Sequence, residues 1–285
     1  MIKNILAVMT LSMVFSCFNV HAEVVKVAKE QRVLYQRDDY LSTILTEALK
    51  AAQYPAEFQY IDVHPHQQRT LLMLSQGKVD IHWSMTSSAR EQLAIPVRIP
   101  LFKGLIGWRV LLIHEARTGQ FLPINTPEQL EPLRALQGHD WPDTKILTQN
   151  GYTVMPHVNY ESMFGLLVRG RGDYFPRSVI EVQSELAVRE PLPLVIEPHL
   201  ILKYPTAFYF FVNQDKPELA SALEKGLMTM HQNGEFNRIF NQYFADFLAQ
   251  LNLGSRNVFE LENTNLPEKT PLARKELWYQ LNNEQ

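Results

Sequence analysis

The sequence contains very little cysteine. Its single cysteine, Cys17, lies in an N-terminal segment that we expect to be removed by cleavage after Ala22. The mature chain would then have no thiol, which excludes disulfide bonds, thiol catalysis and cysteine-ligated metals. Any binding site must therefore be built from other side chains.

The sequence also lacks a strong charge of one sign. It has 27 Lys and Arg against 30 Asp and Glu, a formal net charge of -3, and no basic run. Phosphate binding needs a concentrated Lys/Arg surface, so the composition argues against nucleic acid as a partner. Gly-rich phosphate loops and the G-x-S-x-G and H-E-x-x-H motifs are missing too. We therefore expect no catalysis and no cofactor.

The N-terminus has the pattern of a secretion signal. Lys3 is followed by the apolar stretch Ile5–Val14, and the small residue Ala22 fits a cleavage site. No later apolar run approaches the length of a membrane span. We therefore expect a periplasmic protein with a signal peptide over residues 1–22. An alternative makes Cys17 a lipid-bearing N-terminus, because the residues before it resemble a lipobox, although Phe15 is bulky for that motif.

After this segment, patterns typical of strands and helices alternate. Val24–Ala28 is a β-branched run that is typical of a buried strand, and Tyr40–Ala52 carries apolar residues at helical spacing. Further strands are expected at 57–63, 79–83, 107–113, 173–175 and 206–212, and further helices at 67–75, 142–150, 160–168, 178–188, 216–232 and 236–248. Strands that alternate with helices predict an α/β fold whose sheets have both faces covered.

Three stretches carry recognisable motifs. They are Gly77-Lys78-Val79-Asp80 followed by Ser87-Ser88-Ala89-Arg90, then Gly170-Arg171-Gly172-Asp173, and finally Asn213-Gln214-Asp215-Lys216-Pro217-Glu218-Leu219 through Gly234. In order and spacing they resemble the "G-K-x-D … T-x-x-R", "G-R-x-D" and "K-x-D-P-E-L … D-G" segments of periplasmic solute-binding proteins of the amino-acid-binding type (solute-binding family 3). The resemblance covers roughly Val24 to Phe244, and the chain is identified as a divergent member.

The resemblance implies a two-lobed periplasmic binding protein fold of type II, with two mixed sheets flanked by helices. Lobe 1 would be discontinuous, built from residues 23–113 and 205–285, and lobe 2 would span 114–204. Two crossing segments, near Ile113–Arg117 and Ile201–Pro205, would form the hinge about which the lobes close on a ligand. The polar tail 252–285 is expected to wrap a lobe without forming one.

The resemblance also implies ligand-binding residues in lobe 1. Arg90 matches the family arginine that holds the ligand's α-carboxylate, and a guanidinium presents a planar two-donor fork to a carboxylate. Thr86 and Ser87 stand where a hydroxyl would complete these hydrogen bonds, and the local spacing leaves open which of them contacts the ligand. The competing interpretation makes Arg90 a surface residue beside Glu91.

Arg177 marks a departure from the family pattern. Family members that bind amino acids place an aspartate just after the "G-R-x-D" strand, where it pairs with the ligand's ammonium. Here Arg177 or Ser178 stands at that place. A buried arginine there opposes an ammonium and favours a second anionic group, so a dicarboxylate joins amino-acid-like solutes as a candidate ligand. The alternative is that Arg177 pairs with a local acid such as Glu181.

Four further residues are candidate ligand contacts by position. Asp140 and Trp141 precede a predicted helix of lobe 2, whose free N–H groups can bind an anion, and Asp140 also suits the N-cap of that helix. Trp141, Trp83 and Tyr35 are candidate walls of the cleft. Packing in the core is the alternative for each of these aromatic residues.

Several histidines raise the question of a metal site. His64 and His66 share one loop, whereas His82, His139 and His157 follow at wide spacing. Zinc needs three or four convergent ligands, and no such set is visible in the sequence. We therefore predict no metal site and expect His64 and His66 to be solvated.

These features together predict a monomer that binds a small polar, carboxylate-bearing solute in the periplasm and delivers it to a membrane transporter of the ABC type. Closure would trap the ligand by giving the closed state contacts that the open state lacks. One alternative is a sensing module for a membrane signalling protein. Another is a lyase or dehydratase on the same fold, for which Asp38, Asp39 and Asp140 are the acids that the cleft could offer.

Overall fold

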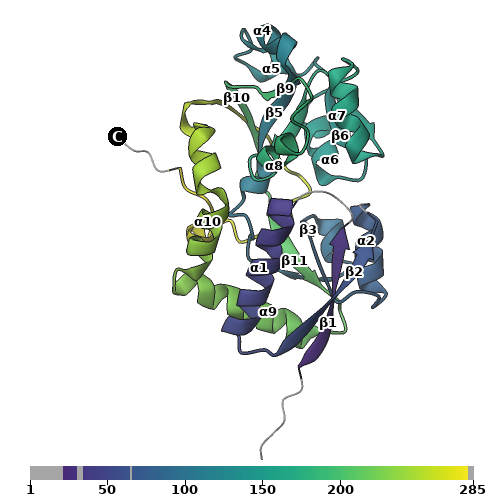
Figure 1. Ribbon diagram of the computed structural model, residues 1–285, viewed down its shortest axis with the longest axis vertical. Helices are drawn as coiled ribbons and strands as arrows, with labels where there is room; N and C mark the ends of the chain where they lie inside the picture. Colours follow the sequence, from purple (N-terminus) through teal and green to yellow (C-terminus); the bar gives the residue numbers. More distant parts are fainter. Residues whose placement is uncertain (1–21, 31–34, 65, 282–285) are drawn as a thin grey trace, which may run out of the picture.

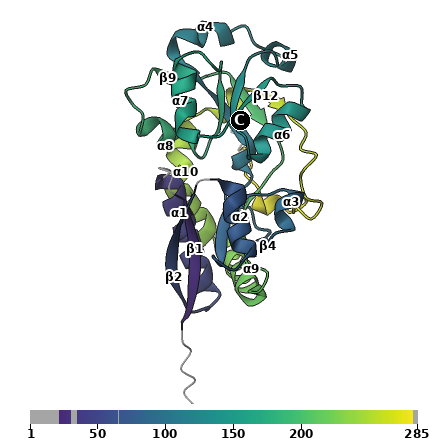
Figure 2. The ribbon, with the colours of Figure 1, turned by 90° about the vertical axis from the view of Figure 1, so that its right-hand side faces the viewer.

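The computed structural model describes residues 22–30, 35–64 and 66–281, except for the side chain of Tyr35. The predicted signal segment with Cys17 therefore lies outside the described residues. Within them the chain forms two lobes, one above the other along the long axis of the molecule (Figures 1 and 2). Each lobe has its own sheet, so the predicted two-lobed α/β architecture is confirmed.

The first lobe is built on a five-stranded sheet in the order β2-β1-β3-β11-β4. Its strands are β1 (Glu23–Glu30), β2 (Ala56–Val63), β3 (Ile81–Met85), β4 (Ile95–Val97) and β11 (Phe208–Val212). Its helices are α1 (Tyr35–Ala51), α2 (Gln67–Ser75), α3 (Ser88–Glu91), α9 (Pro217–Gln232) and α10 (Glu235–Gln250). Every residue of β3 and β11 is buried, because helices cover both faces of the centre of the sheet.

Two of these helices approach each other at a glycine. A Cβ atom on Gly226 of α9 would lie 1.8 Å from the carbonyl oxygen of Ala48 in α1, so this contact requires a residue without a side chain. The close approach brings the apolar faces of α1 and α9 together over the sheet. It fixes α1, whose first turn carries Arg37 toward the second lobe.

The second lobe contains a sheet in the order β12-β10-β5-β8, to which β9 is added beside β5, and a two-stranded sheet of β6 and β7. The strands are β5 (Trp108–His114), β6 (Ala135–Gly138), β7 (Val154–His157), β8 (Phe175–Ser178), β9 (Leu194–Ile196), β10 (Leu200–Lys203) and β12 (Asn257–Glu260). The helices are α4 (Thr118–Phe121), α5 (Pro127–Leu130), α6 (Pro142–Gln149), α7 (Tyr160–Val168) and α8 (Val182–Ala187).

The boundary between the lobes differs from the expected one. The strand expected at 107–113 was assigned to lobe 1, but β5 pairs with β8, β9 and β10 of the second lobe. The chain crosses instead at the 3₁₀ turn Leu105–Gly107 and near Tyr204. The two crossings touch, because the N–H of Tyr204 donates to the carbonyl of Gly107 at 3.1 Å, and a Cβ on Gly107 would lie 2.2 Å from the Tyr204 carbonyl oxygen. An apolar run identifies a strand but not its partners.

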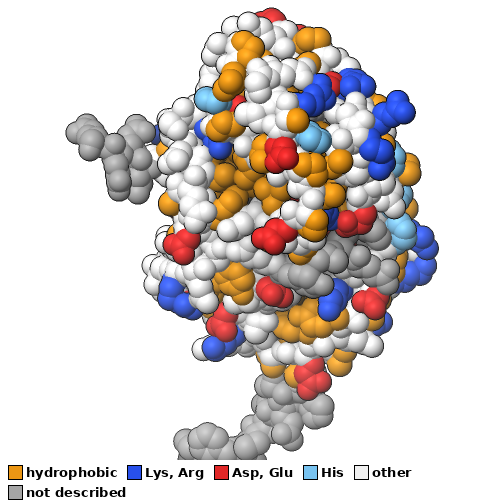
Figure 3. Space-filling model, turned by 45° about the horizontal axis from the view of Figure 1, so that its top comes forward, with side chains coloured by type: hydrophobic (Ala, Val, Ile, Leu, Met, Phe, Trp, Pro, Cys, Tyr) orange, Lys and Arg blue, Asp and Glu red, His pale blue; other side chains and the backbone are white. Residues whose placement is uncertain are grey.

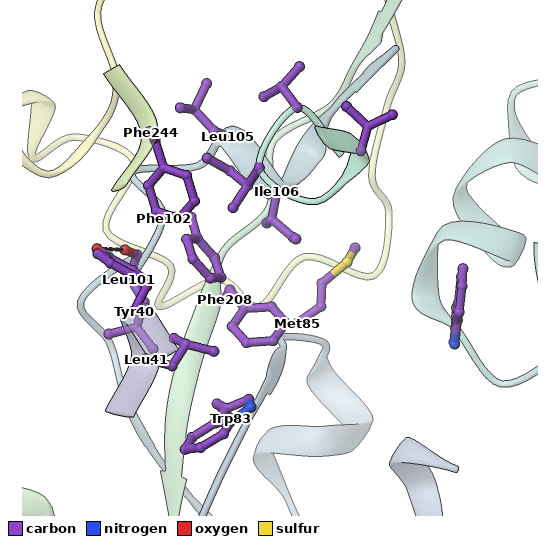
Figure 4. Packing of buried hydrophobic residues seen from close by; sticks show 14 of the residues in the cluster. Tyr40, Leu41, Trp83, Met85, Leu101, Phe102, Leu105, Ile106, Phe208 and Phe244 are labelled. Carbon is purple, nitrogen blue, oxygen red and sulfur yellow. Dashed lines mark hydrogen bonds between the residues drawn. The ribbon is translucent and has the colours of Figure 1, made fainter. Parts of the chain in front are cut away.

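An aromatic cluster lies beneath this crossing (Figure 4). Phe102 stacks on Tyr40 with ring centroids 5.3 Å apart, and Phe244 meets Tyr40 edge to face at 4.9 Å. The Tyr40 hydroxyl donates to the carbonyl of Leu101 at 2.6 Å, so its polar end is satisfied inside the core. The cluster joins helices α1 and α10 to the segment that leads into the crossing.

The C-terminal tail contacts both lobes. Its strand β12 pairs in parallel with β10 of the second lobe, and the tail then descends toward α3 (Figure 2). Asn150 at the end of α6 exchanges two hydrogen bonds with the backbone of Glu262, and the N–H of Ser88 in the first lobe donates to the carbonyl of Asn265 at 3.2 Å. The tail therefore contributes a strand to lobe 2, whereas the sequence assigned it to lobe 1.

Candidate functional site

The space between the lobes is filled by charged side chains from both of them. Arg37 of α1 reaches up from the first lobe, while Arg109 of β5, Arg177 of β8 and Asp143 of α6 face it from the second. The space that remains between them is about 20 Å³, room for about one water molecule. A solute can enter here only when these side chains or the lobes move apart.

Arg177 is enclosed by two carboxylates of its own lobe. Its exposed fraction is 2%, its Nε lies 2.8 Å from Glu185 Oε2, and its Nη2 lies 2.9 Å from Glu181 Oε2. Burial by itself lowers the pKa of Arg177, but Glu185 and Glu181 outweigh it and hold the pKa above its usual value. Its guanidinium also lies over the Trp141 ring, 5.0 Å from the centroid. Arg177 therefore pairs with Glu181, which was the alternative that the sequence left open.

This pairing removes the reason for expecting a second acidic group on the ligand, which had been inferred from Arg177. That inference needed a buried arginine whose charge was available to a ligand, whereas two carboxylates compensate the charge of Arg177. Ser178 is the last residue of β8, and its hydroxyl donates to the carbonyl of Leu105 at the crossing. It does not begin a helix as expected, because the chain makes a turn before α8 and Glu181 is the N-cap.

Glu181 also forms an ion pair that joins the lobes. Arg37 Nη1 lies 3.0 Å from Glu181 Oε1, and both side chains are buried. Burial lowers the pKa of Arg37, but Asp38, Glu181 and Glu30 outweigh it and raise the pKa well above its usual value. The carboxylate of Glu181 thus contacts a cation from each lobe, Arg37 below and Arg177 above.

Arg109 pairs with two carboxylates inside the second lobe, Asp143 and, with its Nη1 3.7 Å from Oε2, Glu181. Arg109 Nη2 lies 2.5 Å from Asp143 Oδ1, and its Nε donates to the Tyr204 hydroxyl at 2.9 Å. The same hydroxyl donates to Asp143. Three arginines (Arg37, Arg109 and Arg177) therefore meet three carboxylates (Asp143, Glu181 and Glu185) in the buried interface, which we call the inner network. Charges buried in this way are tolerated because each is paired and hydrogen-bonded.

Arg90 lies beside the inner network and bridges the lobes in a different way. It is 7% exposed, and its Nη1 donates to Ser84 Oγ at 2.7 Å and to the carbonyl of Met85 at 3.0 Å, both at the end of β3. Its Nη2 donates to the carbonyl of Asp140 in the second lobe at 3.1 Å. The interpretation of Arg90 as an exposed surface residue is therefore wrong.

The hydroxyl residues near Arg90 divide into different roles. Ser87 is the N-cap of α3, and its hydroxyl accepts from the N–H of Arg90. Thr86 donates instead to Glu91 at 2.8 Å, which also pairs with Arg98. The hydroxyl that touches the guanidinium belongs to Ser84, which the sequence analysis did not single out.

A larger cavity opens next to Arg90, between α3 and α6. Its volume is about 350 Å³, and its lining includes Arg90, Ser87, Asp140, Trp141 and Lys145. Cavities of this size accept small organic ligands. Asp140 does not cap α6 as expected, because Trp141 occupies the N-cap position.

Two other predicted wall residues remain to be placed. Trp83 is 3% exposed and belongs to the buried cluster of Figure 4. Its ring meets that of Phe210 with centroids 6.3 Å apart, so Trp83 packs in the core, which was the alternative for it. Tyr35 begins α1, and its side chain is outside what the structure describes. Arg37, Arg109, Asp143 and Glu185 were missed, although Glu185 is one helical turn beyond Glu181 in the sequence.

The described part of the chain has neither a membrane-spanning helix nor a group of side chains that could hold a metal ion. Within residues 22–30, 35–64 and 66–281, no helix is long and apolar enough to cross a membrane, and no three acidic, histidine or cysteine side chains are placed to hold a metal ion as they stand. On the face shown in Figure 3, basic and acidic side chains are interspersed with apolar ones.

Comparisons with known proteins identify the fold. No family model and no curated protein match the sequence. Three solved structures cover 77–78% of this chain. An ancestral arginine-binding protein bound to arginine has 14% identity, a TM-score of 0.57 and 98% of its own length covered. A histidine kinase sensor domain with similarity to periplasmic binding proteins has 14% identity and a TM-score of 0.56, with 96% of its own length covered. The VFT2 domain of Bordetella pertussis BvgS has 18% identity and a TM-score of 0.61, with 93% of its own length covered.

At these identities the comparisons establish the architecture. The chain has the two-lobed fold of periplasmic solute-binding proteins, as the three sequence motifs predicted.

Proposed function

We propose that this protein is an exported binding protein that holds a small, carboxylate-bearing solute between its lobes and delivers it to a membrane transporter. The observation that carries the proposal is the position of Arg90. Its guanidinium is anchored to the first lobe by Ser84 and Met85 and directs Nη2 toward the second lobe. Periplasmic export is part of the proposal and is supported by the N-terminal sequence pattern.

A carboxylate would improve on the contact that Arg90 makes across the cleft. At present Nη2 donates to a neutral carbonyl, that of Asp140. A carboxylate in the same place would accept a charge-assisted hydrogen bond, which is shorter and stronger than a bond to a neutral acceptor. The solute would then touch both lobes and stabilise the closed arrangement, since a ligand shifts an equilibrium by its differential affinity for the two states.

The adjacent cavity limits what the solute can be. With about 350 Å³ between α3 and α6, it suits a molecule of amino-acid or dicarboxylate size. An ammonium or polar group could reach Asp140 in the wall, whereas a second acidic group would find Lys145 on α6. Arg177 is not offered as a ligand residue, because Glu181 and Glu185 enclose it.

The test is a thermal-shift screen of amino acids and dicarboxylates with the mature chain. A specific solute should raise the melting temperature by mass action, and Arg90→Ala should abolish that rise. Arg238→Ala is the matched control, because Arg238 is an exposed residue of α10 far from the cleft. A solute that stabilises Arg90→Ala as much as the unaltered protein would overturn the proposal.

A sensing role is the second candidate. It is favoured by the contacts that the protein's own side chains make between the lobes, above all Arg37 with Glu181. A solute would act by rearranging these contacts, and the lobe movement could pass to a membrane signalling partner. A histidine kinase sensor domain is among the structures with this fold. Whether the purified protein binds the periplasmic part of a transporter or of a kinase would separate the two roles.

A further inference from the structure

The C-terminal tail follows the chain across the hinge. Its strand β12 pairs in parallel with β10, and beyond the two strands the N–H of Leu261 donates to the carbonyl of Lys203 at 2.7 Å. The side-chain amide of Asn263 then donates to the carbonyl of Pro205 at 3.0 Å. The tail therefore runs beside the crossing that leads from the second lobe back to the first. We call residues 257–281 the tail strap.

The upper part of the tail strap is held by the second lobe. Besides the pairing of β12 with β10, Asn150 at the end of α6 exchanges two hydrogen bonds with the backbone of Glu262, at 2.8 and 2.9 Å. The hydroxyl of Thr264 donates to the side-chain oxygen of Gln149, also on α6, at 2.7 Å. Residues 257–264 should therefore move with the second lobe.

The lower part of the tail strap is held by the first lobe, at the residues that lead into the other crossing. Leu277 is fully buried, and the N–H of Tyr279 donates to the carbonyl of Lys103 at 2.8 Å. The indole of Trp278 lies against Gly104, because a Cβ atom on this glycine would be 2.4 Å from Trp278 Cε3. This end of the strap should therefore move with the first lobe.

Between its two ends the tail strap passes the cavity beside Arg90. The carbonyl of Asn265 accepts from the N–H of Ser88 in α3 at 3.2 Å and from its hydroxyl at 3.4 Å. Asn265 also lines the cavity of about 350 Å³ between α3 and α6 (the yellow tail of Figure 2 descends there). The strap thus connects the two helices that form opposite walls of this cavity, one from each lobe.

We propose that the tail strap is a third crossing of the hinge and limits how far the two lobes open. Opening moves α3 away from α6, and the strap is held on both. Wide opening must therefore break its hydrogen bonds to Ser88 or to Asn150, each of which contributes modestly to stability. The strap makes wide opening costly without forbidding it, which narrows the range of hinge movement.

The first experiment cuts the tail strap without removing a residue. The recognition sequence of a site-specific protease is inserted between Glu268 and Lys269, which are both exposed and lie between the two held ends. Leu72→Cys in the first lobe and Leu122→Cys in the second, 44% and 57% exposed, carry spin labels. A chain that begins at residue 23 has no native cysteine to compete with them.

Double electron–electron resonance then measures the distances between the two labels before and after the cut, without any solute. Cutting the strap should broaden the distribution and shift it to longer distances, because the lobes separate more widely. The matched control carries the same insertion between Glu190 and Pro191, an exposed turn inside the second lobe. An unchanged distribution after the strap is cut, or equal broadening after the control is cut, would overturn the proposal.

A pair of substitutions tests the strap without a cut, and decides the matter if circular dichroism shows that the cut protein loses its fold. Asn150→Ala removes both hydrogen bonds to the backbone of Glu262 and should shift the label distances in the same direction. Glu262→Ala changes only an exposed side chain and should leave them unchanged. Equal distributions in the two variants would contradict the proposal. Because no solute is added, the result is independent of the role proposed for Arg90.

Discussion

The inner network uses charge differently from the edge of the cleft, where the rings of His64, His66 and His139 lie near one another and near Asp140. Arg37, Arg109 and Arg177 are at most 3% exposed, and each has a carboxylate within 3.0 Å. At this edge, by contrast, the imidazoles of His64 and His139 are exposed and a carboxylate oxygen of Asp140 has no hydrogen-bond partner. Charges that folding forces out of water are committed to protein partners, whereas groups at the rim remain available for a ligand.

The free energy of unfolding should therefore depend on the inner network. The response to ligands should depend on the groups around it. A buried ion pair contributes little net stability but is strongly destabilising when one partner is removed. Exposed groups carry little stability in either direction. Each of the following experiments can break or sharpen this contrast.

The largest effect is expected from Glu185→Ala. Glu185 is fully buried, binds Arg177 through both oxygens and accepts from the Tyr160 hydroxyl at 2.6 Å. Its removal leaves Arg177 short of a partner in the interior and should lower the free energy of unfolding by about 3–5 kcal/mol. Urea denaturation measures this.

Glu161→Ala provides the control for that measurement. Glu161 pairs with Arg189 but is 57% exposed at its side chain, so its loss should change the free energy of unfolding by less than about 1 kcal/mol. If Glu185→Ala were as mild as Glu161→Ala, the inner network would not be the source of stability that we describe.

A smaller effect on stability, with a larger effect on shape, is expected from Glu181→Gln. This change removes the charge that pairs with Arg37 across the lobes, while Arg177 keeps Glu185. The free energy of unfolding should fall by about 1–3 kcal/mol, and the radius of gyration should rise because the lobes separate more readily. Glu185→Gln, which acts within the second lobe, should leave the radius of gyration unchanged. The reverse pattern would show that Glu181 does not join the lobes.

The smallest effect concerns a histidine that is enclosed rather than at the rim. Burial first, then Lys103 and Arg274, lowers the pKa of His231 to about 4, and its ring stacks on Phe236 with centroids 4.0 Å apart. In the unfolded chain the imidazole of His231 has the usual histidine pKa of 6.5. Between these values only the unfolded chain binds the proton, so this contribution to stability is complete above pH 6.5 and is lost as the pH falls toward 4.

Urea denaturation at several pH values tests this expectation. His231→Gln should flatten the decline of stability between pH 6.5 and 4, whereas His66→Ala, in the loop between β2 and α2, should leave the decline in place. An unaltered decline in His231→Gln would show that burial of this imidazole is not its cause.

The elements of the fold were readable from the sequence because their signals are local. Helices α2 and α7 have the predicted bounds, and the β-branched and aromatic runs became β1 and β11. Apolar spacing of 3.6 residues or apolar runs of strand length depend only on near neighbours in the chain. The three motifs added the two-lobed architecture through their order, which a local pattern alone could not supply.

The site was only partly readable, since its contacts join residues far apart in the chain. Arg90 and Trp141 were named and do lie at the interface, and the pairing of Arg177 with Glu181 was weighed as an alternative. The partnership of Arg37 with Glu181 spans 144 positions, and nothing local indicates it. The same holds for His66 and His139, whose ring centroids lie 5.2 Å apart although nothing in the sequence indicated that they meet.

The sequence by itself indicated the longer helices and several of the strands, and its motifs indicated two lobes. Its single cysteine, Cys17, lies outside the described residues, which therefore contain no thiol. Tertiary structure alone decided which sheet β5 and β12 join, that Arg177 is neutralised by its own lobe, and that His66 and His139 come together from different lobes. The physical reason is that hydrophobic periodicity acts over a few residues, whereas the partner of a charge is set by how whole elements pack.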